Sequence, residues 1–313
     1  MPRLSESIVP RASTSARTIA LVTDTNDWHA RGLRKAFAAL GAHTVLLKLA
    51  ACRFDTGAGY GLHLPDFDLG LPDAVLVRDM AGGTFEAVTL RLGILHALQE
   101  IGIPVWNAAR SIERCVDKSA TSFLLARAGL PTPMTWAMES REAAAEVVRR
   151  EAGPFVLKPL FGSQGRGLRL IRGERDLPDP AEVAGGVYYL QRFVGVERDG
   201  FRDFRVLVSG GRVLAAMMRH SLHWVTNVKR GGKPVAAVAD AAMRDLAVAA
   251  AAVVGANFAG VDMVCDQDGR LSVLEVNSMP AWSGLQRTTS IDIAATLASD
   301  LVATLPMQAQ RNV

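Results

Sequence analysis

The chain of 313 residues is long enough to bury a substantial core, and its 49% hydrophobic and 21% charged residues are ordinary for a globular protein. No run approaches the ~18 consecutive apolar residues of a membrane-spanning helix, which argues against a membrane as a partner. The net charge of +4 is spread over scattered basic residues with only 6% aromatics. Nucleic acid is therefore not expected as a partner, whereas an anionic small molecule fits this charge.

The cysteines and the N-terminal segment bear on the cellular location. Cys52, Cys115 and Cys265 lie far apart with no C-x-x-C pair, which is typical of free thiols in a reducing compartment, so a cytoplasmic protein is expected. Residues 1–16 are rich in Ser, Arg and Pro and lack the apolar stretch of a secretion signal. They are interpreted as a disordered tail, with a transit peptide as the alternative.

Strand and helix patterns alternate from residue 17 to residue 110, which we take as the first structural unit. The expected strands cover 19–23, 45–49, 73–78 and 105–107, and the expected helices cover 29–40 and 84–100. This order predicts a small, mostly parallel sheet. No G-x-G-x-x-G motif follows the first strand, so a nicotinamide-binding role is disfavoured.

The pattern changes after residue 110. A helix at 111–129, ended by Pro131 and Pro133, is followed by strands, hairpins and two further helices. The expected strands cover 155–158, 168–171, 188–191, 204–208, 213–218, 260–264 and 271–276, and the expected helices cover 238–254 and 291–305. The predicted fold class is therefore α/β followed by α+β with antiparallel sheets, divided into a central unit (111–187) and a C-terminal unit (188–313).

A lysine at the end of an apolar strand, Lys158, precedes a glycine-rich segment. A lysine in that position is partly buried, so its charge needs a partner. The segment that follows consists of Gly162, Ser163, Gln164, Gly165, Arg166 and Gly167. Glycines permit turns that aim several backbone N–H groups at one anion, which favours phosphate binding. The alternative is an ordinary glycine hairpin with a surface lysine; a P-loop is excluded because no Gly-Lys-Ser/Thr follows at the required spacing.

Two expected strands joined at Asp268-Gly269 carry acidic and amide side chains. Glu275 and Asn277 are two residues apart and therefore face the same side of one strand. A hairpin centred on the Asp-Gly turn brings Asp262, on the other strand, close to Glu275. Two carboxylates and an amide oxygen form a hard, all-oxygen site suited to Mg²⁺ that bridges phosphates. The alternative is a pair of solvent-facing acids on an edge hairpin.

Two further stretches are less informative. Lys118 follows Asp117 in a polar part of the expected helix, and by itself it is interpreted as a solvated lysine. The polar segment 220–232 suits either a mobile surface loop or a loop whose arginine grips carboxylate or phosphate oxygens. It contains Trp224, Thr226, Asn227, Lys229 and Arg230 ahead of two glycines. His220 and His223 could suggest zinc, but two histidines without a nearby cysteine make that reading weak.

Taken together, these segments resemble the ATP-grasp superfamily and, more closely, the RimK-like amino-acid ligases. The resemblance runs from about residue 115 to residue 293, and the strand–helix unit before it is similar to the domain that usually precedes. The matching motifs are Asp117-Lys118, Val156-Leu-Lys158, the glycine segment 162–167, Gly260-Val-Asp262, Leu274-Glu-Val-Asn277 and Thr288-Thr-x-Ile-Asp292. Each motif alone is common, but their combination in this order is specific.

The resemblance implies a role for each candidate residue. Lys118 and Lys158 would contact the phosphates of ATP, and the glycine segment would close over them. The backbone of Gln191, Arg192, Phe193 and Val194 would hydrogen-bond adenine. Asp262, Glu275 and Asn277 would hold Mg²⁺, with two ions expected and Mn²⁺ as an alternative. Arg219 and Arg230 would neutralise the transferred phosphate, and Asn227 belongs to the same loop motif, which is similar to the lysine-biosynthesis branch.

Three departures from the family pattern are visible. Arg192 stands where relatives often carry Glu, which puts the ribose contact on Glu197 or Asp203. Lys229 replaces a small residue or His. The segment Pro280-Ala-Trp-Ser283 replaces a Pro-Gly pattern, and its tryptophan, Trp282, is expected to shape an unfamiliar acceptor pocket.

The implied activity is an ATP-dependent ligation that forms an amide through an acylphosphate and releases ADP and phosphate. The expected amine is the α-amino group of L-glutamate, and the acceptor is a small-molecule or carrier carboxylate; a homo-oligomer is expected. One alternative is an ATP-grasp ligase of cofactor or amino-acid biosynthesis that uses another amine. A second is a nucleotide-binding regulator without turnover, against which the three intact metal oxygens argue. An RNA-binding protein would need a clustered basic face, and none is visible.

Overall fold

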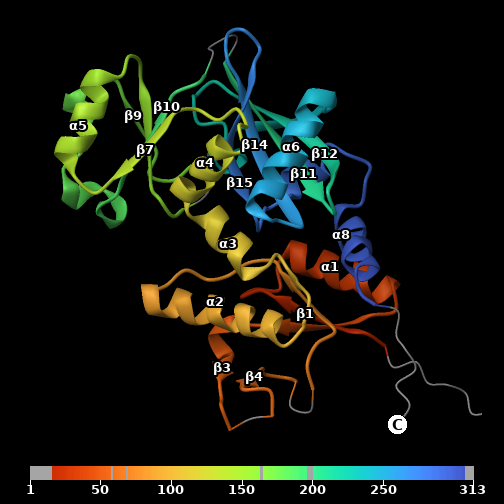
Figure 1. Ribbon diagram of the computed structural model, residues 1–313. Coiled ribbons are helices and arrows are strands. Elements are labelled where there is room, and N and C mark those ends of the chain that lie inside the picture. Colours follow the sequence, from red (N-terminus) through yellow and green to blue (C-terminus); the bar gives the residue numbers. More distant parts are fainter. Residues whose placement is uncertain (1–15, 58, 68–69, 163–164, 196–199, 307–313) are drawn as a thin grey trace, which may run out of the picture.

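The computed structural model describes residues 16–57, 59–67, 70–162, 165–195 and 200–306 (Figure 1). The predicted N-terminal tail, apart from its last residue, lies outside these ranges. Among these residues, no helix is both long and apolar enough to cross a membrane.

The first unit is a four-stranded parallel sheet with the strand order β2-β1-β5-β6. Its elements are β1 (Thr18–Val22), α1 (Trp28–Ala39), β2 (His43–Leu47), β5 (Ala74–Val77), α2 (Phe85–Glu100) and β6 (Val105–Trp106). The predicted parallel sheet is thus confirmed. The sequence analysis missed the short antiparallel pair β3 (Arg53–Phe54) and β4 (Leu62–His63).

Alternation along β1 explains how helices cover both faces of this sheet. Ile19 and Leu21 pack in one core with α1 and with α8 (Ile293–Ala303), the last helix of the chain. Ala20 and Val22 point to the other face and pack in a second core with α2. Successive strand residues face opposite sides, so a four-residue apolar run serves both layers. The C-terminal helix therefore stabilises the first unit.

The single helix expected at 111–129 is wrong, because the chain breaks at Asp117 into α3 (Ala109–Val116) and α4 (Lys118–Arg127). Asp117 adopts an extended conformation, and its carboxylate accepts hydrogen bonds from the backbone N–H of Ser119 at 2.8 Å and of Ala120 at 3.1 Å. An acidic residue that caps a new helix in this way ends the preceding one. Lys118 consequently stands at the first turn of α4.

The second sheet has four antiparallel strands in the order β7-β10-β8-β9. They are β7 (Thr135–Met138), β8 (Phe155–Lys158), β9 (Arg169–Ile171) and β10 (Tyr188–Arg192), covered by α5 (Arg141–Arg150). The sequence analysis did not anticipate β7 or α5. Its division at residue 187 assigns β10 to the C-terminal unit, whereas β10 pairs inside this sheet between β7 and β8.

The third sheet has five antiparallel strands in the order β13-β12-β11-β14-β15, with α6 packed on it (Figure 1). Its elements are β11 (Phe201–Ser209), β12 (Arg212–Ser221), β13 (Lys233–Ala237), α6 (Ala241–Val254), β14 (Phe258–Cys265) and β15 (Leu271–Asn277), followed by α7 (Ser283–Gln286). Short 3₁₀ turns occur at Leu49–Ala51, Glu174–Asp176, Pro180–Glu182, Ala184–Gly186 and Val228–Arg230. Both predicted hairpins and the antiparallel second half are confirmed.

One buried side chain joins the first unit to the end of the third sheet. Asn107 donates from Nδ2 to the carbonyl oxygens of Phe258 and Ser278, both at 2.6 Å, and its Oδ1 accepts from the Phe258 N–H at 3.0 Å. Three hydrogen bonds from one fully buried amide fix the start of β14 and the residue after β15. The hairpin that carries Asp262 and Glu275 is thereby held in place against the parallel sheet.

Candidate active site

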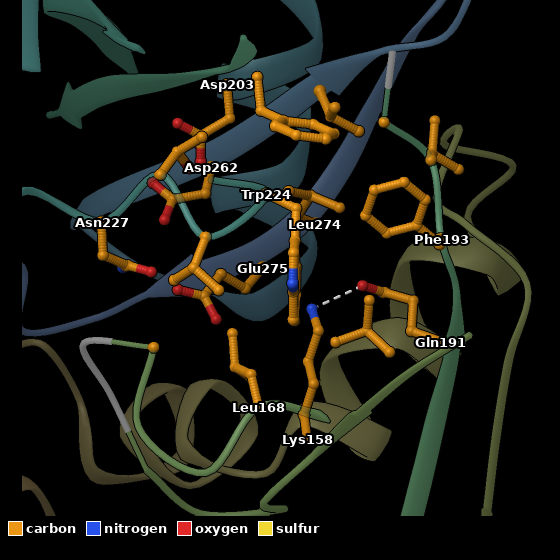
Figure 2. A pocket seen from close by; sticks show the side chains of 18 of the residues that line it. Lys158, Leu168, Gln191, Phe193, Asp203, Trp224, Asn227, Asp262, Leu274 and Glu275 are labelled. Carbon is orange, nitrogen blue, oxygen red and sulfur yellow. Dashed lines mark hydrogen bonds between the residues drawn. The ribbon is translucent and has the colours of Figure 1, made fainter. Parts of the chain in front are cut away.

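A cavity of about 940 Å³, open in part to solvent, lies between the second and third sheets (Figure 2). Most of the predicted site residues line it: Lys118, Lys158, Gly162, Gly165, Arg166, Gln191, Arg192, Phe193, Val194, Asp203, Arg219, Asn227, Asp262 and Glu275. The structure therefore brings together segments that are far apart in the sequence. Ser163, Gln164 and Glu197 lie outside the described residues.

Three predicted residues do not line the cavity but contact residues that do. Arg230 donates from Nη2 to the carbonyl oxygen of Gly165 at 3.1 Å. Asn277 donates from Nδ2 to Oε1 of Glu275 at 3.0 Å. Gly167 has a φ of +70°, and a Cβ at this position would lie 2.8 Å from Cγ of Pro159. Glycine is required there both by the backbone conformation and by the close approach.

Two lysines line the cavity, and one of them belongs to the second sheet. Lys158 ends β8, and its Nζ donates to Oε1 of Gln191, on the neighbouring strand β10, at 2.6 Å (Figure 2). Burial lowers the pKa of Lys158 below its ordinary value, and the carboxylate of Glu275 acts in the opposite direction. A desolvated ammonium group with one neutral acceptor is electrostatically under-compensated. It is therefore well suited to bind an anion.

Lys118 reaches the same region from the first turn of α4. Its Nζ donates to the carbonyl oxygens of Gly162 at 2.8 Å and Leu160 at 3.3 Å. Burial lowers its pKa, and the carboxylates of Glu275 and Asp117 act in the opposite direction. By holding two carbonyl groups ahead of the glycine segment, Lys118 fixes where that segment begins. Lys118, which its own sequence context did not single out, therefore lies close to the other residues expected to bind phosphate.

The third sheet contributes the predicted metal ligands. Asp262 on β14 pairs directly with Glu275 on β15, as expected, although the register of the two strands shifts by one residue between Asp262 and Met263. Asp262 is 2% exposed, and its carboxylate accepts from Nε and Nη2 of Arg205 at 2.7 Å each. Nη2 of Arg219 lies 2.9 Å from the same carboxylate. Burial alone would raise the pKa of Asp262, but the two guanidinium groups hold it well below its ordinary value.

Arg219 connects Asp262 to a second buried acid. Its Nε donates to Asp203 at 2.7 Å, and its Nη2 also donates to that carboxylate. The two carboxylates raise the pKa of Arg219 despite burial, and burial raises the pKa of Asp203. Arg205, Asp262, Arg219 and Asp203 thus form a chain of alternating charge, which we call the arginine–aspartate network. Both oxygens of Asp203 accept from Arg219, so a ribose hydroxyl would have to share them.

The sequence analysis missed Arg205. It stands directly opposite Asp262 where β11 pairs with β14. The only signal in the sequence is that Asp203 and Arg205 are two residues apart and share one face of an expected strand. That Arg205 meets Asp262 depends on the pairing of β11 with β14, and these two strands are not consecutive along the chain.

The donor set of Asp262, Glu275 and Asn277 fits a hard divalent cation. Asn277 uses its amide N–H to orient Glu275, which leaves its carbonyl oxygen free to coordinate. Oδ1 of Asp262 keeps a second lone pair beside its bond to Arg205, whereas Oδ2 is contacted by both Arg205 and Arg219. Among the described residues, no cluster of three or more His, Cys, Asp or Glu side chains offers an all-protein cage. A site that supplies few protein ligands and relies on phosphate oxygens is typical of Mg²⁺.

Much of the remaining lining is apolar and suits a planar base. Leu168, Leu274, Val156, Phe193 and Trp224 all line the cavity beside the backbone of residues 191–194 (Figure 2). Apolar walls with a few fixed polar groups are the usual lining of a small-molecule site. A flat heterocycle would therefore lie at this end, with its phosphates toward the lysines.

The loop that follows β12 closes against the glycine segment. A Cβ added to Gly165 would lie 2.6 Å from Oδ1 of Asn227 and 2.8 Å from Cγ1 of Val225, so the two segments are in tight contact. The segment expected as a loop at 220–232 is shorter than predicted, because β12 extends to Ser221. Nδ1 of His223 accepts from the Val225 N–H at 3.1 Å, which orders the start of the loop.

Arg192 points away from the cavity. Its Nη2 donates to Glu151 at 3.0 Å and its Nη1 to the carbonyl oxygen of Ala152, while its guanidinium lies over the rings of Trp136 and Phe155. Successive strand residues alternate in facing, so Gln191 faces the cavity and Arg192 does not. The cavity receives the backbone of Arg192 and not its charge.

Comparisons with known proteins identify similar chains. Residues 115–301 match the RimK-like ATP-grasp domain. The chain is 31% identical over 301 residues to the tetrahydromethanopterin:alpha-L-glutamate ligase of Methanosarcina acetivorans, which covers 84% of this chain and 92% of that one. It is 30% identical over 288 residues to a probable alpha-L-glutamate ligase of Sodalis glossinidius, with 90% and 95% covered.

The solved structures show the same fold. The ATP-grasp ligase PsnB, in complex with a phosphomimetic variant of a minimal precursor, Mg and ADP, superimposes with a TM-score of 0.73. Its sequence identity is 22%, and the match covers 92% of this chain and 98% of that one. This likeness supports the arrangement of the three sheets.

Proposed function

We propose that this chain, which belongs to the RimK-like ATP-grasp family and is an ATP-dependent ligase, joins the α-amino group of L-glutamate to a carboxylate of an acceptor. The relatives named alpha-L-glutamate ligases support glutamate as the amine. The acceptor is a carboxylate-bearing small molecule or carrier. The products are an amide, ADP and phosphate.

The observation that carries this proposal is the opposition of charges across one cavity. Lys118 and Lys158 extend from one side, and Asp262 and Glu275 lie on the other. The lysines suit the phosphates of ATP, and the carboxylates with Asn277 suit the metal that accompanies them. When bound, Mg²⁺, or Mn²⁺ in its place and as one or two ions, neutralises charge on the phosphate oxygens.

The reaction balances in two displacements. A carboxylate oxygen of the acceptor attacks the γ-phosphorus of ATP, the bond to the β-phosphate oxygen breaks, and ADP leaves with an acylphosphate formed. The amine nitrogen of glutamate then attacks the acyl carbon, phosphate leaves, and the amine gives up a proton. Lys118 and Lys158 orient the phosphates and stabilise charge on the transferring group. Arg219 and Arg230, with Asn227 between the loops, are proposed to neutralise and enclose the phosphate.

The test is an incubation of the full chain with ATP, Mg²⁺, L-glutamate and a panel of acceptors. The panel contains pterin-linked and peptide carboxylates, because one relative's name mentions a pterin and the ligase PsnB, which shares the fold, has been solved with a precursor peptide. ADP and phosphate should appear together with an acceptor heavier by one glutamyl residue, and D-glutamate should not replace the L-isomer. Release of AMP and pyrophosphate would overturn the mechanism. Nucleotide binding without turnover on any acceptor–amine pair would favour the regulator.

A different amine remains the second candidate within the same chemistry. Other amino acids replace glutamate in the same assay, at a saturating concentration of the acceptor. Only the preferred amine should then support the consumption of ATP, which distinguishes the two candidates. The homo-oligomer expected from the resemblance stays a prediction, and light scattering of the purified chain tests it.

A further inference from the structure

Arg78 is a buried arginine outside the nucleotide cavity whose guanidinium makes no hydrogen bond to any residue that the structure describes. It is 8% exposed and follows β5 directly. Its Nε is fully buried without a partner, and its nearest acid, Asp27, lies 3.9 Å from Nη2. The terminal nitrogens are not among the fully buried unpaired atoms, so both still reach the surface. Burial of a charged group without hydrogen bonds is costly.

The two acids near Arg78 have their oxygens occupied by other groups. Asp27 accepts from the Ala30 N–H at 2.9 Å, as the cap of α1, and from Nδ1 of His29 at 3.0 Å. Asp79 accepts from the hydroxyl of Thr23 and from the Asp24 N–H, each at 2.9 Å. These bonds tie the ends of β1 and β5 together. The negative charges of the two carboxylates still lie near Arg78, but neither carboxylate forms a hydrogen bond with its guanidinium group.

The position of Arg78 in the sheet is the one where ligands bind in open parallel sheets. The chain runs from β1 to β2 on one side and then returns to β5 on the other side of β1. The strand order reverses between β1 and β5, and Thr23 and Arg78 follow the carboxyl ends of these two strands. The crevice outside the carboxyl ends at such a reversal is the usual ligand site of the fold.

The third observation links Arg78 to the catalytic hairpin. Its guanidinium carbon lies 5.2 Å from the ring centroid of Trp282, which belongs to the short segment after the predicted metal ligand Asn277. The backbone N–H of Trp282 donates to Nε2 of His29 at 3.2 Å. The indole N–H of Trp282, in contrast, has no acceptor among the described residues. The short segment that follows Asn277 therefore connects the candidate active site with the Trp282 ring, which packs against Arg78.

We propose that Arg78, with Trp282 beneath it, binds a carboxylate of the acceptor other than the one that is activated. The identification of the bound molecule as the acceptor rests on the proposed function, whereas the anion site at Arg78 does not depend on it. A carboxylate offers two parallel oxygens to a guanidinium fork, which is the partner that the described residues do not supply. Because Arg78 does not line the cavity that holds the phosphates, the group it binds lies away from the reacting centre. Binding energy from such a remote group orients the reacting one.

The test uses the full chain labelled with ¹⁵N at tryptophan and glutarate as a dicarboxylate probe. The five tryptophans give five indole signals, and Trp282→Phe identifies the one of interest. Glutarate should shift the Trp282 signal in a saturable way. Arg78→Gln should weaken the apparent affinity about tenfold or more, as expected for loss of charge-assisted hydrogen bonds, and Arg78→Lys should fall between, since it keeps the charge and loses the fork.

The matched control is Arg53→Gln, which removes an exposed arginine of the same unit and should leave the glutarate response unchanged. A Trp282 signal that ignores glutarate in the wild type, or that responds equally in Arg78→Gln and wild type, overturns the proposal. If Arg78→Gln loses signal dispersion through misfolding, Arg78→Lys decides in its place. An ATP analogue with Mg²⁺ should move the Trp224 signal in the same sample; its failure would count against the nucleotide site and leave the Arg78 result standing.

Discussion

Both sides of the candidate nucleotide cavity carry cationic side chains, but these are compensated in different ways. On one side, Lys158 of β8 and Lys118 of α4 donate only to neutral carbonyl and amide oxygens. On the third sheet, Arg205 and Arg219 are paired with buried carboxylates in the arginine–aspartate network. The network is electrostatically complete within the protein, whereas the lysines are not. The difference indicates that the network fixes the geometry of the site and that the lysines provide the charge that a ligand neutralises.

The largest effect is expected from Asp262→Ala, which breaks the network. Removal of this carboxylate leaves Arg205 without a described partner and Arg219 with Asp203 alone. Breaking a buried pair costs roughly 3–5 kcal/mol, which corresponds to a fall in melting temperature of roughly 5–8 °C for a chain of this size. Calorimetry would measure this, and ADP release should be lost as well. A melting temperature within error of the wild type would show that the network does not carry stability.

Glu275→Gln should separate catalysis from stability. Glu275 accepts from Asn277 but is not hydrogen-bonded to either arginine, so its neutral analogue keeps the fold and loses a negative metal ligand. We expect turnover to fall by about 10³-fold, about 4 kcal/mol in the barrier, with the melting temperature unchanged. Single-turnover ADP release measures the first and calorimetry the second. Full activity in this variant would refute the metal assignment.

The parts that the sequence predicted are those decided by neighbouring residues. The Asp-Gly turn, with Gly269 at a φ of +80°, predicts the hairpin of β14 and β15 and hence that Asp262 lies near Glu275. The register shift between Asp262 and Met263, which places the two carboxylates directly opposite each other, was not predicted. The alternating apolar pattern of the first unit likewise predicts its parallel sheet. Lys118 was found only through the family resemblance, because nothing in its immediate sequence distinguishes it.

The parts that were missed depend on contacts between distant segments. Arg205 meets Asp262 only because β11 inserts between β12 and β14. The helix period continues through Asp117, so the break is visible only in the cap that this side chain forms. Strand β7 was missed because a four-residue strand with partly exposed side chains carries little periodic signal. Helix α5, in contrast, has a visible signal, since Ser140 caps it and Ala144, Ala145 and Val147 form a buried face.

Lys158→Met should have an intermediate effect that falls on ligand binding alone. The variant removes a desolvated charge whose partner is one amide oxygen, so stability should be unchanged or slightly higher. The Michaelis constant for ATP should rise about 10- to 100-fold, the equivalent of one or two charge-assisted hydrogen bonds. Steady-state kinetics with varied ATP measure it. A variant that melts lower than Asp262→Ala would reverse the assignment of roles to the two sides.

The ligand-free protein should also show the sign of the Lys158 pKa shift. Burial lowers this pKa below 10.5, so the folded protein releases the proton at a lower pH than the unfolded chain. Between the lowered pKa and 10.5 the unfolded chain binds more protons, and stability therefore rises with pH in that window. The melting temperature of the wild type relative to Lys158→Met should accordingly increase from about pH 7 to about pH 10. A decrease would mean that the ammonium is stabilised by a partner in the folded state.

The smallest effect is expected from Arg192→Ala, which tests whether all cations at the cavity matter. Arg192 stands at the predicted adenine contact, but its guanidinium is paired with Glu151 and stacked on Trp136, on the opposite face of β10. Loss of this partly exposed pair should cost under about 1 kcal/mol, and the Michaelis constant for ATP should stay within about twofold. Glu151→Gln is the matched control and should reproduce the small change in stability. A tenfold rise in the Michaelis constant for ATP in Arg192→Ala, but not in Glu151→Gln, would indicate that the guanidinium contacts the ribose. The distinction between paired and unpaired cations would then no longer predict which residues bind the nucleotide.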